Sequence, residues 1–333
     1  MAAQQRERLF LIDGTALAYR AYFAFIRNPL RTASGENTSA VFGVANSLLK
    51  IRREENPDYW VFTFDRPEPT FRHKIAEDYK ATRPETPDEL IDQLPRVKEA
   101  ADALGCPLIE MPGYEADDLI ATLARRAVKE GLDVVIVSGD KDLMQLVTDR
   151  ITIYNPRKAG AEVERLDPAG VKEKFGVPPE QVRDVLALMG DTSDNVPGIP
   201  GIGPKTAIQL IGEYGDLEAT LAAADSVKRE SLREKLKTHA DKARLSFKLV
   251  TLDENCPIDW EPDRWRVVDA DDRTAVRLFT DLRFKSLLKW LSPAAGGTAP
   301  ADETPADEPA AVVDRAGAYH RVTSLTELRT LAQ

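Results

Sequence analysis

The chain has 333 residues, of which 43% are hydrophobic and 30% are charged, and its formal net charge at pH 7 is −10. This length predicts one large domain with additional pieces, and the acidic balance argues weakly against a nucleic-acid partner. Two cysteines, Cys106 and Cys256, provide neither a disulfide framework nor a zinc-binding spacing, which favours a reducing, cytoplasmic location. No stretch approaches about 20 apolar residues, so neither a signal peptide nor a membrane span is expected.

The first half of the chain alternates between apolar runs typical of buried strands and segments with helical periodicity. This alternation predicts an α/β fold over residues 6–167, with a central, mostly parallel sheet flanked by helices. Strands are expected at 8–13, 59–64, 108–111, 133–137 and 151–154, and helices at 38–53, 87–104 and 115–130.

The second half has a helical pattern from residue 168 to residue 291. Helices are expected there at 182–189, 204–214, 229–248 and 282–291. Residues 292–311 are rich in Ala, Pro, Gly and acidic residues, which predicts a disordered linker. A new strand-then-helix pattern follows and stops in mid-helix, so we expect the chain to be a fragment of a longer protein.

Carboxylates recur where strands are expected to end and helices to begin. Because the carboxyl ends of parallel strands share one edge of a sheet, these acids are expected to converge on one place. Carboxylates at such density repel one another unless hard cations neutralise them, and oxygen ligands suit Mg²⁺ or Mn²⁺. The nine acids are Asp13, Asp65, Glu115, Asp117, Asp118, Asp140, Asp142, Asp191 and Asp194.

Each of these acids also has a simpler explanation. Acids favour helix N-termini, where the helix dipole stabilises them, and Asp13, Ser138 or Asp140 could serve as ordinary caps or turn residues. At a single position this explanation is the better one. The three acids of GYEADDL exceed what capping requires, and the pattern recurs at separate strand ends, which favours a shared metal site.

The run VPGIPGIGPKTA predicts a tight turn that leads into a helix. Gly198, Gly201 and Gly203 allow close approach of the backbone to a partner, and Lys205 and Thr206 add a charge and a hydroxyl. Such a turn at a helix N-terminus can bind a phosphate of the nucleic-acid backbone independently of sequence. The spacing excludes a P-loop, and the alternative is a structural hairpin between helices.

The segment FRHKIAEDYKATRPETP interleaves cations with aromatic residues directly after Asp65. This composition suits a single strand or flap of nucleic acid, through charge and stacking, although an ordinary solvated surface has a similar one. The cations and aromatics are Arg72, Lys74, Lys80, Arg83, Phe71, His73 and Tyr79.

Together, LIDGTALAYRAYFA, FTFDRPEPTFRHKIAEDYKATR, GYEADDLIATLA, VSGDKDLMQLV and LMGDTSDNVPGIPGIGPKTA resemble the 5′ nuclease domains of bacterial DNA polymerase I, within the flap endonuclease family. The resemblance covers about residues 6–291. It implies that the carboxylates hold two divalent metals that hydrolyse a phosphodiester. The first implied group is Asp13, Asp65, Glu115 and Asp117, and the second is Asp118, Asp140, Asp142, Asp191 and Asp194.

The resemblance also implies roles for the basic residues. Residues 66–87 correspond to a helical arch, in which Lys80 and Arg72 are catalytic groups at the scissile phosphate. Residues 184–214 correspond to a helix–hairpin–helix element that grips duplex DNA and is similar to sites that bind K⁺. The implied contacts with DNA outside the hairpin are Arg20, Tyr22, Tyr79 and Arg83.

The implied activity is that of a structure-specific 5′-3′ exonuclease and 5′-flap endonuclease in the bacterial cytoplasm. The sequence is silent on the oligomeric state, for which a monomer is the default expectation. The implied partners are DNA with 5′ flaps, nicks or RNA primers, in replication and repair. Residues 312–333 resemble the start of a proofreading-exonuclease-like domain, which implies a parent DNA polymerase.

Three rival interpretations remain. LIDGT is similar to the loop of haloacid dehalogenase phosphatases, but Leu11 stands where that chemistry needs an Asp nucleophile. A PIN-type ribonuclease shares strand-end acids but does not account for the glycine run and the basic segment. A non-enzymatic DNA-binding scaffold has no use for nine acids that oppose the phosphate backbone.

Overall fold

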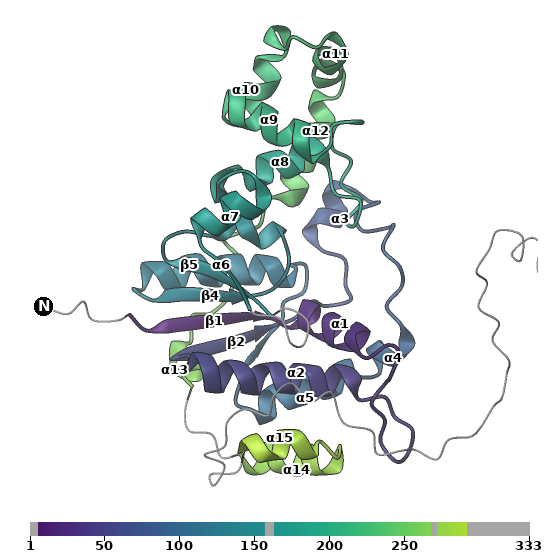
Figure 1. Ribbon diagram of the computed structural model, residues 1–333, viewed down its shortest axis with the longest axis vertical. Helices are drawn as coiled ribbons and strands as arrows, with labels where there is room; N and C mark the ends of the chain where they lie inside the picture. The colour runs from purple at the N-terminus through teal and green to yellow at the C-terminus, as the bar shows by residue number, and fades with distance from the viewer. Residues whose placement is uncertain (1–5, 157–162, 268–271, 292–333) are drawn as a thin grey trace, which may run out of the picture. The chain divides into compact units, whose positions relative to one another are not determined.

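The structure, a computed structural model, describes residues 6–156, 163–267 and 272–291, so the expected linker and the expected start of a further domain lie outside the described residues. Its centre is a six-stranded sheet in the order β3-β2-β1-β4-β5-β6 (Figure 1). The first five strands pair in parallel, and β6 pairs antiparallel with β5. The strands are β1 (Arg8–Asp13), β2 (Tyr59–Thr63), β3 (Leu108–Ile109), β4 (Asp133–Val137), β5 (Ile151–Asn155) and β6 (Glu164–Leu166).

The central strands are buried on both faces. Side chains alternate along a strand, so Leu9 and Leu11 enter the hydrophobic core on one face, while Phe10 and Ile12 enter the core on the other. We call the first the α6-side core and the second the α2-side core. Near-continuous apolar runs are therefore required in β1, β2 and β4, as parallel sheets covered by helices on both faces demand.

Helices from both ends of the described chain build the α2-side core. They are α1 (Gly14–Ala24), α2 (Ser39–Lys50), the π-helix η1 (Ile51–Glu55), α4 (Asp88–Ile91), α5 (Leu94–Ala103), α14 (Arg273–Asp281) and α15 (Lys285–Leu291).

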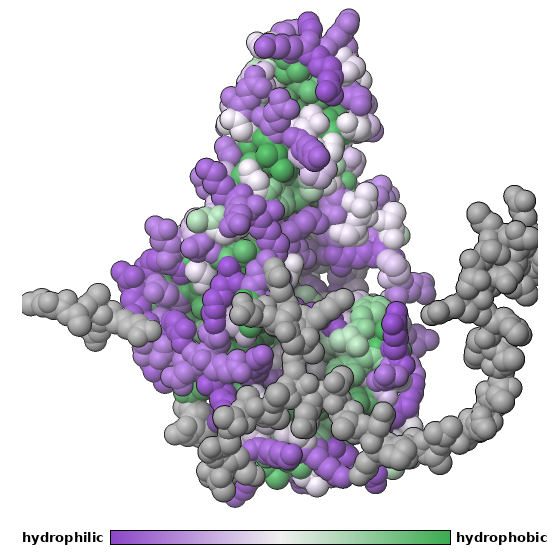
Figure 2. Space-filling model, in the orientation of Figure 1, coloured by the Kyte–Doolittle hydropathy of each residue, from purple (hydrophilic) through white to green (hydrophobic). Residues whose placement is uncertain are grey.

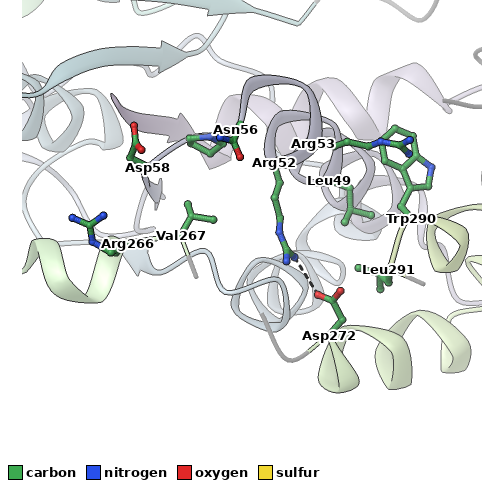
Figure 3. Close-up of a pocket in the computed structure, with 11 residues that line it drawn as sticks. Leu49, Arg52, Arg53, Asn56, Asp58, Arg266, Val267, Asp272, Trp290 and Leu291 are labelled. Atoms are coloured by element: carbon green, nitrogen blue, oxygen red, sulfur yellow. Dashed lines mark hydrogen bonds and ion pairs between the residues drawn. The ribbon is translucent and has the colours of Figure 1, made fainter. Parts of the chain in front are cut away.

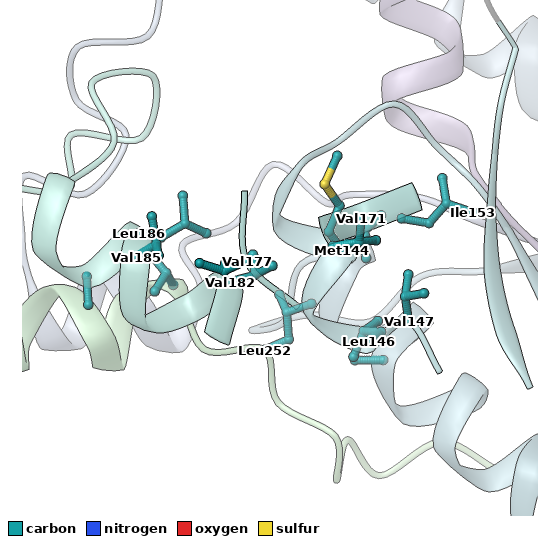
Figure 4. Close-up of a cluster of buried hydrophobic side chains, with 14 of the residues drawn as sticks. Met144, Leu146, Val147, Ile153, Val171, Val177, Val182, Val185, Leu186 and Leu252 are labelled. Atoms are coloured by element: carbon teal, nitrogen blue, oxygen red, sulfur yellow. The ribbon is translucent and has the colours of Figure 1, made fainter. Parts of the chain in front are cut away.

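The α6-side core runs from the sheet into the second half of the chain. Figure 4 shows Val182, Val185 and Leu186 of that half in one cluster with Met144 and Leu146 of the first half. This apolar packing continues across the predicted boundary at residue 167. The contributing helices are α6 (Ala116–Lys129), η2 (Asp142–Leu146), α7 (Pro168–Phe175), α8 (Val182–Met189), α9 (Pro204–Tyr214), α10 (Leu217–Ala222), η4 (Ala224–Ser226), α11 (Glu230–Thr238), α12 (Ala240–Val250) and α13 (Pro262–Trp265).

Two segments that were each predicted as one helix are divided into two helices in the structure. The helix expected at 87–104 is divided into α4 and α5, and a proline stands in the first turn of α5, where its missing N–H does no harm. The helix expected at 229–248 is divided into α11 and α12 by the non-helical backbone of His239. The elements α1, α14 and β6 were not predicted.

The basic segment at 66–87 contains one short helix, α3 (Phe71–Ile75), and turns at 77–82, and the rest of it is bends and irregular backbone. A further short helix, η3 (Pro179–Gln181), precedes α8. In the described ranges no helix combines the length and the apolar character that a membrane span needs. Hydrophilic side chains cover most of the face seen in Figure 2.

Candidate metal centre and nucleic-acid interface

The strand order reverses direction between β1 and β4, because the chain continues outward from β1 through β2 to β3 and then returns to β4. In open α/β sheets, ligands bind outside the carboxyl ends of the strands at such a switch point. Asp13 ends β1, and Ser138 directly follows β4. The Ser138 Oγ donates a hydrogen bond of 2.8 Å to Asp13 Oδ2, so the two strand ends meet at this place.

Four of the nine acids gather at the switch point: Asp13, Asp65, Asp117 and Asp140, the strand-end group. Asp13 caps α1, with Oδ1 accepting from the Ala16 N–H at 2.9 Å. Asp65 follows β2 and accepts from the Ala116 N–H at 2.8 Å, which ties that strand to the start of α6. Within the described residues, none of the four forms an ion pair with Lys or Arg.

The strand-end group behaves as a set of crowded negative charges. Burial is the largest cause that raises the pKa of Asp13 to about 7; the charges of Asp65 and Asp140 act in the same direction, and the hydrogen bonds from Ala16 and Ser138 act against them. Burial also raises the pKa of Asp117 well above its usual value, reinforced by the charges of Asp140, Asp13 and Asp65. The four carboxylates therefore lie within range of one another's charge.

Asp142, the first residue of η2, links this group to the loop before α9. Burial raises the pKa of Asp142 to about 8, with the charge of Asp140 as the next contribution. Its Oδ1 is buried and has no hydrogen-bond partner among the described residues. An unsatisfied buried carboxylate oxygen is costly, which marks it as a position where a cation would be favourable.

Asp191 and Asp194 of that loop are held by cations. The Lys141 Nζ lies 2.6 Å from Asp191 Oδ2, and this hydrogen bond lowers the pKa of Asp191 although burial acts in the opposite direction. Arg83 lies 2.5 Å from Asp194 Oδ1, and the Tyr79 hydroxyl donates to Asp194 Oδ2 at 3.2 Å. The lysine between the acids of GDKD was the sequence signal for the first of these pairs, and we had not assigned it a role.

Glu115 and Asp118 form a capping box at the start of α6, so the simpler explanation of acids at a helix N-terminus holds for these two. The Lys80 Nζ also donates to Glu115 Oε1 at 2.6 Å. Asp118 is fully buried and binds the guanidinium of Arg72 through both oxygens, at 2.7 and 2.8 Å. Its neighbour Asp117 belongs instead to the strand-end group.

Arg72 is placed differently from the predicted catalytic position. Its side chain is 1% exposed, and it also donates to the carbonyl oxygens of Leu249 at 2.8 Å and Thr251 at 3.0 Å. These contacts tie the start of the basic segment to Asp118 and to the end of α12. In this conformation Arg72 therefore connects elements inside the protein and does not face a substrate phosphate.

The donor set fits a hard divalent cation in chemistry, although its side chains are not arranged as a finished site. Among residues 6–156, 163–267 and 272–291, no group of three or more His, Cys, Asp or Glu is placed to hold one metal ion. The strand-end group and Asp142 nevertheless provide carboxylate oxygens, raised pKa values and an unsatisfied buried oxygen. A bound cation would coordinate these oxygens, lower the raised pKa values and satisfy the buried oxygen of Asp142. Ligand sets made only of oxygens favour Mg²⁺ or Mn²⁺.

The two residues of α1 predicted to contact DNA, Arg20 and Tyr22, differ in their exposure and partners. Tyr22 is 5% exposed and lies in the α2-side core, so it is not presented to a ligand. Arg20 is half-buried and donates to Asn155 Oδ1 and to the Pro156 carbonyl. The neighbouring Phe23 and Ile26 are exposed by 51% and 53%, and the sequence analysis did not single them out.

The glycine run forms the predicted tight turn between α8 and α9. Gly198 and Gly201 have φ values of 57° and 76°, in the region that favours glycine. A Cβ on Gly198 would collide with the backbone of Gly190, and one on Gly201 would collide with the ammonium of Lys235, a residue missed by the sequence analysis. Gly203 is the N-cap of α9, followed by an exposed Lys205 and a half-buried Thr206.

A surface pocket lies away from these acids. Figure 3 shows this pocket of about 460 Å³, lined by Arg52, Asp272 and Trp290 among others, and none of the nine acids lines it. Its Asp58 immediately precedes β2, which puts it at the amino edge of the sheet. Arg52 pairs with Asp272 at 3.1 Å, and the guanidinium of Arg53 lies 5.0 Å from the centre of the Trp290 ring.

Known proteins match nearly all of the described chain. The family described as 5′-3′ exonuclease, N-terminal resolvase-like domain, matches residues 8–176, and the 5′-3′ exonuclease, C-terminal SAM fold, matches residues 177–273. DNA polymerase I of Bacillus caldotenax is 42% identical over 284 residues, which are 85% of this chain and 32% of the relative. The thermostable DNA polymerase I of Thermus thermophilus is 43% identical over 286 residues, 86% of this chain and 33% of the relative. The chain therefore spans about a third of the length of these relatives.

Solved structures share the fold. A zinc-bound T5 5′-exonuclease matches with a TM-score of 0.64 and 20% identity, over 86% of this chain and 100% of that one. The catalytic core of Rad2 in complex with DNA substrate matches with a TM-score of 0.55 and 18% identity, over 86% of this chain and 93% of that one. With its central parallel sheet, its helical second half and both matched domains, the chain belongs to the 5′-3′ exonuclease family.

Proposed function

We propose that this chain is a metal-dependent nuclease that hydrolyses phosphodiesters of DNA at 5′ ends and 5′ flaps. One observation carries the proposal: the strand-end group collects four carboxylates at the topological switch point, and no cation of the described residues pairs with them. Such an arrangement is unfavourable in the protein alone and becomes favourable with divalent cations. Membership of the 5′-3′ exonuclease family supports the same conclusion.

The strand-end group and Asp142 are the residues that would hold Mg²⁺ or Mn²⁺, with Glu115, Asp191 and Asp194 completing the shell, whereas both oxygens of the buried Asp118 are taken by Arg72. Bound cations of this kind activate water and stabilise charge on a reacting phosphate. Lys80, half-buried beside Glu115, is the cation of the chain best placed to balance phosphate charge in a partly desolvated site. Nothing in this chemistry needs a covalent intermediate on a Ser or Cys.

The glycine turn and the start of α9 supply a second contact, with duplex DNA. The exposed Lys205 and the backbone N–H groups at a helix N-terminus suit a phosphate, independently of base sequence. Carbonyl groups of the same turn are candidates for binding K⁺. Arg83 and Arg20 would contact the strand that carries the 5′ end, whereas Tyr79, like Tyr22, is 5% exposed and is not presented to it.

The biological setting follows from the relatives, which are DNA polymerase I chains about three times as long. We propose that the nuclease removes RNA primers and repair flaps as part of such a polymerase, in the bacterial cytoplasm, and that it acts as a monomer. DNA with 5′ flaps, nicks or RNA primers would be the substrate.

The test is incubation of the protein with a 5′-labelled flap duplex in Mg²⁺ or in EDTA, beside the variant Asp13→Ala. We expect cleavage near the flap junction in Mg²⁺, none in EDTA, and none by the variant, which should still bind the duplex. Cleavage by Asp13→Ala at the unaltered rate would refute the metal centre. Tight DNA binding without cleavage in any divalent cation would favour the scaffold instead.

A further inference from the structure

Residues 78–83 of the basic segment lie directly on the acidic loop at residues 191–195. The backbone N–H of Lys80 donates to the Asp194 carbonyl at 2.9 Å, and Asn195 Nδ2 donates to the Asp78 carbonyl at 2.7 Å. The Thr82 hydroxyl donates to the Thr192 carbonyl at 3.3 Å. These contacts join segments more than 100 residues apart in the sequence, so the two segments are docked on each other at several points.

The docked segment also places its polar side chains on two of the predicted metal ligands. Lys80 Nζ lies 2.6 Å from Glu115 Oε1 and 3.8 Å from Asp194 Oδ2. The Tyr79 hydroxyl donates to both carboxylates at 3.2 Å, and Arg83 pairs with Asp194 at 2.5 Å. The side chains of Glu115 and Asp194 are exposed by 9% and 12%, so these pairs are less screened by water than surface pairs.

The backbone of the docked segment is held in an unfavourable conformation. Lys80 has φ of 60°, the left-handed region that residues with a Cβ rarely adopt, and Asn195 opposite it has φ of 55°. Such conformations persist where surrounding contacts over-determine them, and they cluster at switch regions. Release of the contacts to Glu115 and Asp194 would remove what holds Lys80 in this conformation.

We infer that residues 79–83 form a latch: their cations hold Glu115 and Asp194 in the metal-free protein, and divalent cations that bind these carboxylates release it. The inference rests on the proposed metal centre. A cation bound at Glu115 or Asp194 takes the oxygens that Lys80 and Arg83 now occupy and repels both side chains. Metal binding therefore frees Lys80 and Arg83 for a substrate phosphate. The segment is docked when the site is metal-free and released when the site holds metal.

The latch predicts that its cations compete with metal in the absence of DNA. Titration with Mn²⁺ in a calorimeter should show binding at least about fivefold tighter in Lys80→Met and in Arg83→Met than in the unaltered protein, because a positive charge leaves the site. Lys174→Met is the matched control. It breaks a lysine–carboxylate pair with Glu164 at 2.5 Å on the antiparallel edge of the sheet, and it should leave Mn²⁺ affinity unchanged.

A second measurement needs no variant. Amide hydrogen exchange of residues 79–83 should become faster when Mn²⁺ or Ca²⁺ is added without DNA, because the N–H of Lys80 loses its bond to Asp194. Equal Mn²⁺ affinity in all variants together with unchanged exchange would overturn the latch and leave the nuclease assignment standing. Failure of the unaltered protein to bind Mn²⁺ at all would refute the metal centre, and the latch with it.

Discussion

Eight of the nine acids divide into two regions with opposite electrostatics, and the ninth, Asp142, lies between them with Lys141 Nζ 4.0 Å from its Oδ1. The strand-end group has no ion-pair partner in the described chain, whereas Glu115, Asp118, Asp191 and Asp194 are each held by Lys or Arg. Adjacent residues fall on different sides of this division: Asp117 joins the strand-end group, and Asp118 binds Arg72. Successive residues of a helix point about 100° apart, so one step along α6 changes the partner completely. Within the motif GYEADDL, one aspartate therefore belongs to a group of mutually repelling carboxylates, and the next aspartate forms a stabilising ion pair.

The largest expected effect is on catalysis by the strand-end group. Asp140→Asn should lower the single-turnover rate of flap cleavage by about 10³-fold, because it removes a charge that the cation needs. The same variant should be no less stable than the unaltered protein without metal, since it relieves repulsion. A variant that cleaves normally, or one that is markedly less stable in EDTA, would break the distinction between the two regions.

Asp118→Asn should show the reverse pattern, with a large effect on stability. It removes the carboxylate that binds the buried guanidinium of Arg72 through both oxygens and leaves Glu115, at 3.4 Å, as the remaining carboxylate partner, which costs about 3 kcal/mol of unfolding free energy. Urea denaturation measures this loss. The double variant Arg72→Met, Asp118→Leu should recover part of it, since no unpaired charge then remains. A single variant as stable as the unaltered protein would mean that the pair does not hold this part of the fold.

Stability without metal should fall as pH rises. The pKa values of Asp13 and Asp142 are raised in the folded protein to about 7 and about 8, so the folded state holds protons that the unfolded state releases near pH 4. Their contribution is full below about pH 4 and is lost as pH rises through 7 to 8. Between pH 5.5 and 8.5 in EDTA we expect a loss on the order of 5 kcal/mol in urea denaturation, reversed by Mg²⁺ at the higher pH.

The smallest expected effect lies at the glycine turn, far from the acids. Lys205→Ala should weaken duplex binding about threefold to fivefold. It should also reduce the slope of log affinity against log salt concentration by about one, the amount expected for the loss of one phosphate contact. Fluorescence anisotropy at several salt concentrations measures both quantities. Lys172→Ala, an exposed lysine on α7, should change neither. Unchanged affinity and slope for Lys205→Ala would remove the turn from the DNA interface.

The central strands, and the edge of the sheet at which Asp13 and Asp140 lie, could be predicted from local sequence alone. The apolar runs of β1, β2 and β4 were predicted with nearly the observed bounds, because burial on both faces demands continuous hydrophobicity. Parallel pairing then requires residues that end those strands, such as Asp13 and Asp140, to meet at one edge. The tight glycine turn was predictable for a similar local reason, since the φ values of Gly198 and Gly201 favour glycine.

Which of the acids lack an ion-pair partner in the described chain depends on contacts between distant segments. Asp118 meets Arg72 across 46 residues of sequence, and Asp194 meets Tyr79 across 115. Such pairs depend on how distant elements pack, and no local spacing reports them. The same holds for Arg72, whose sequence context suggested a substrate contact and whose burial makes it an internal connection. Which ion pairs form depends on which side chains packing brings close in space. Strands and turns depend instead on the conformational and burial preferences of their own residues.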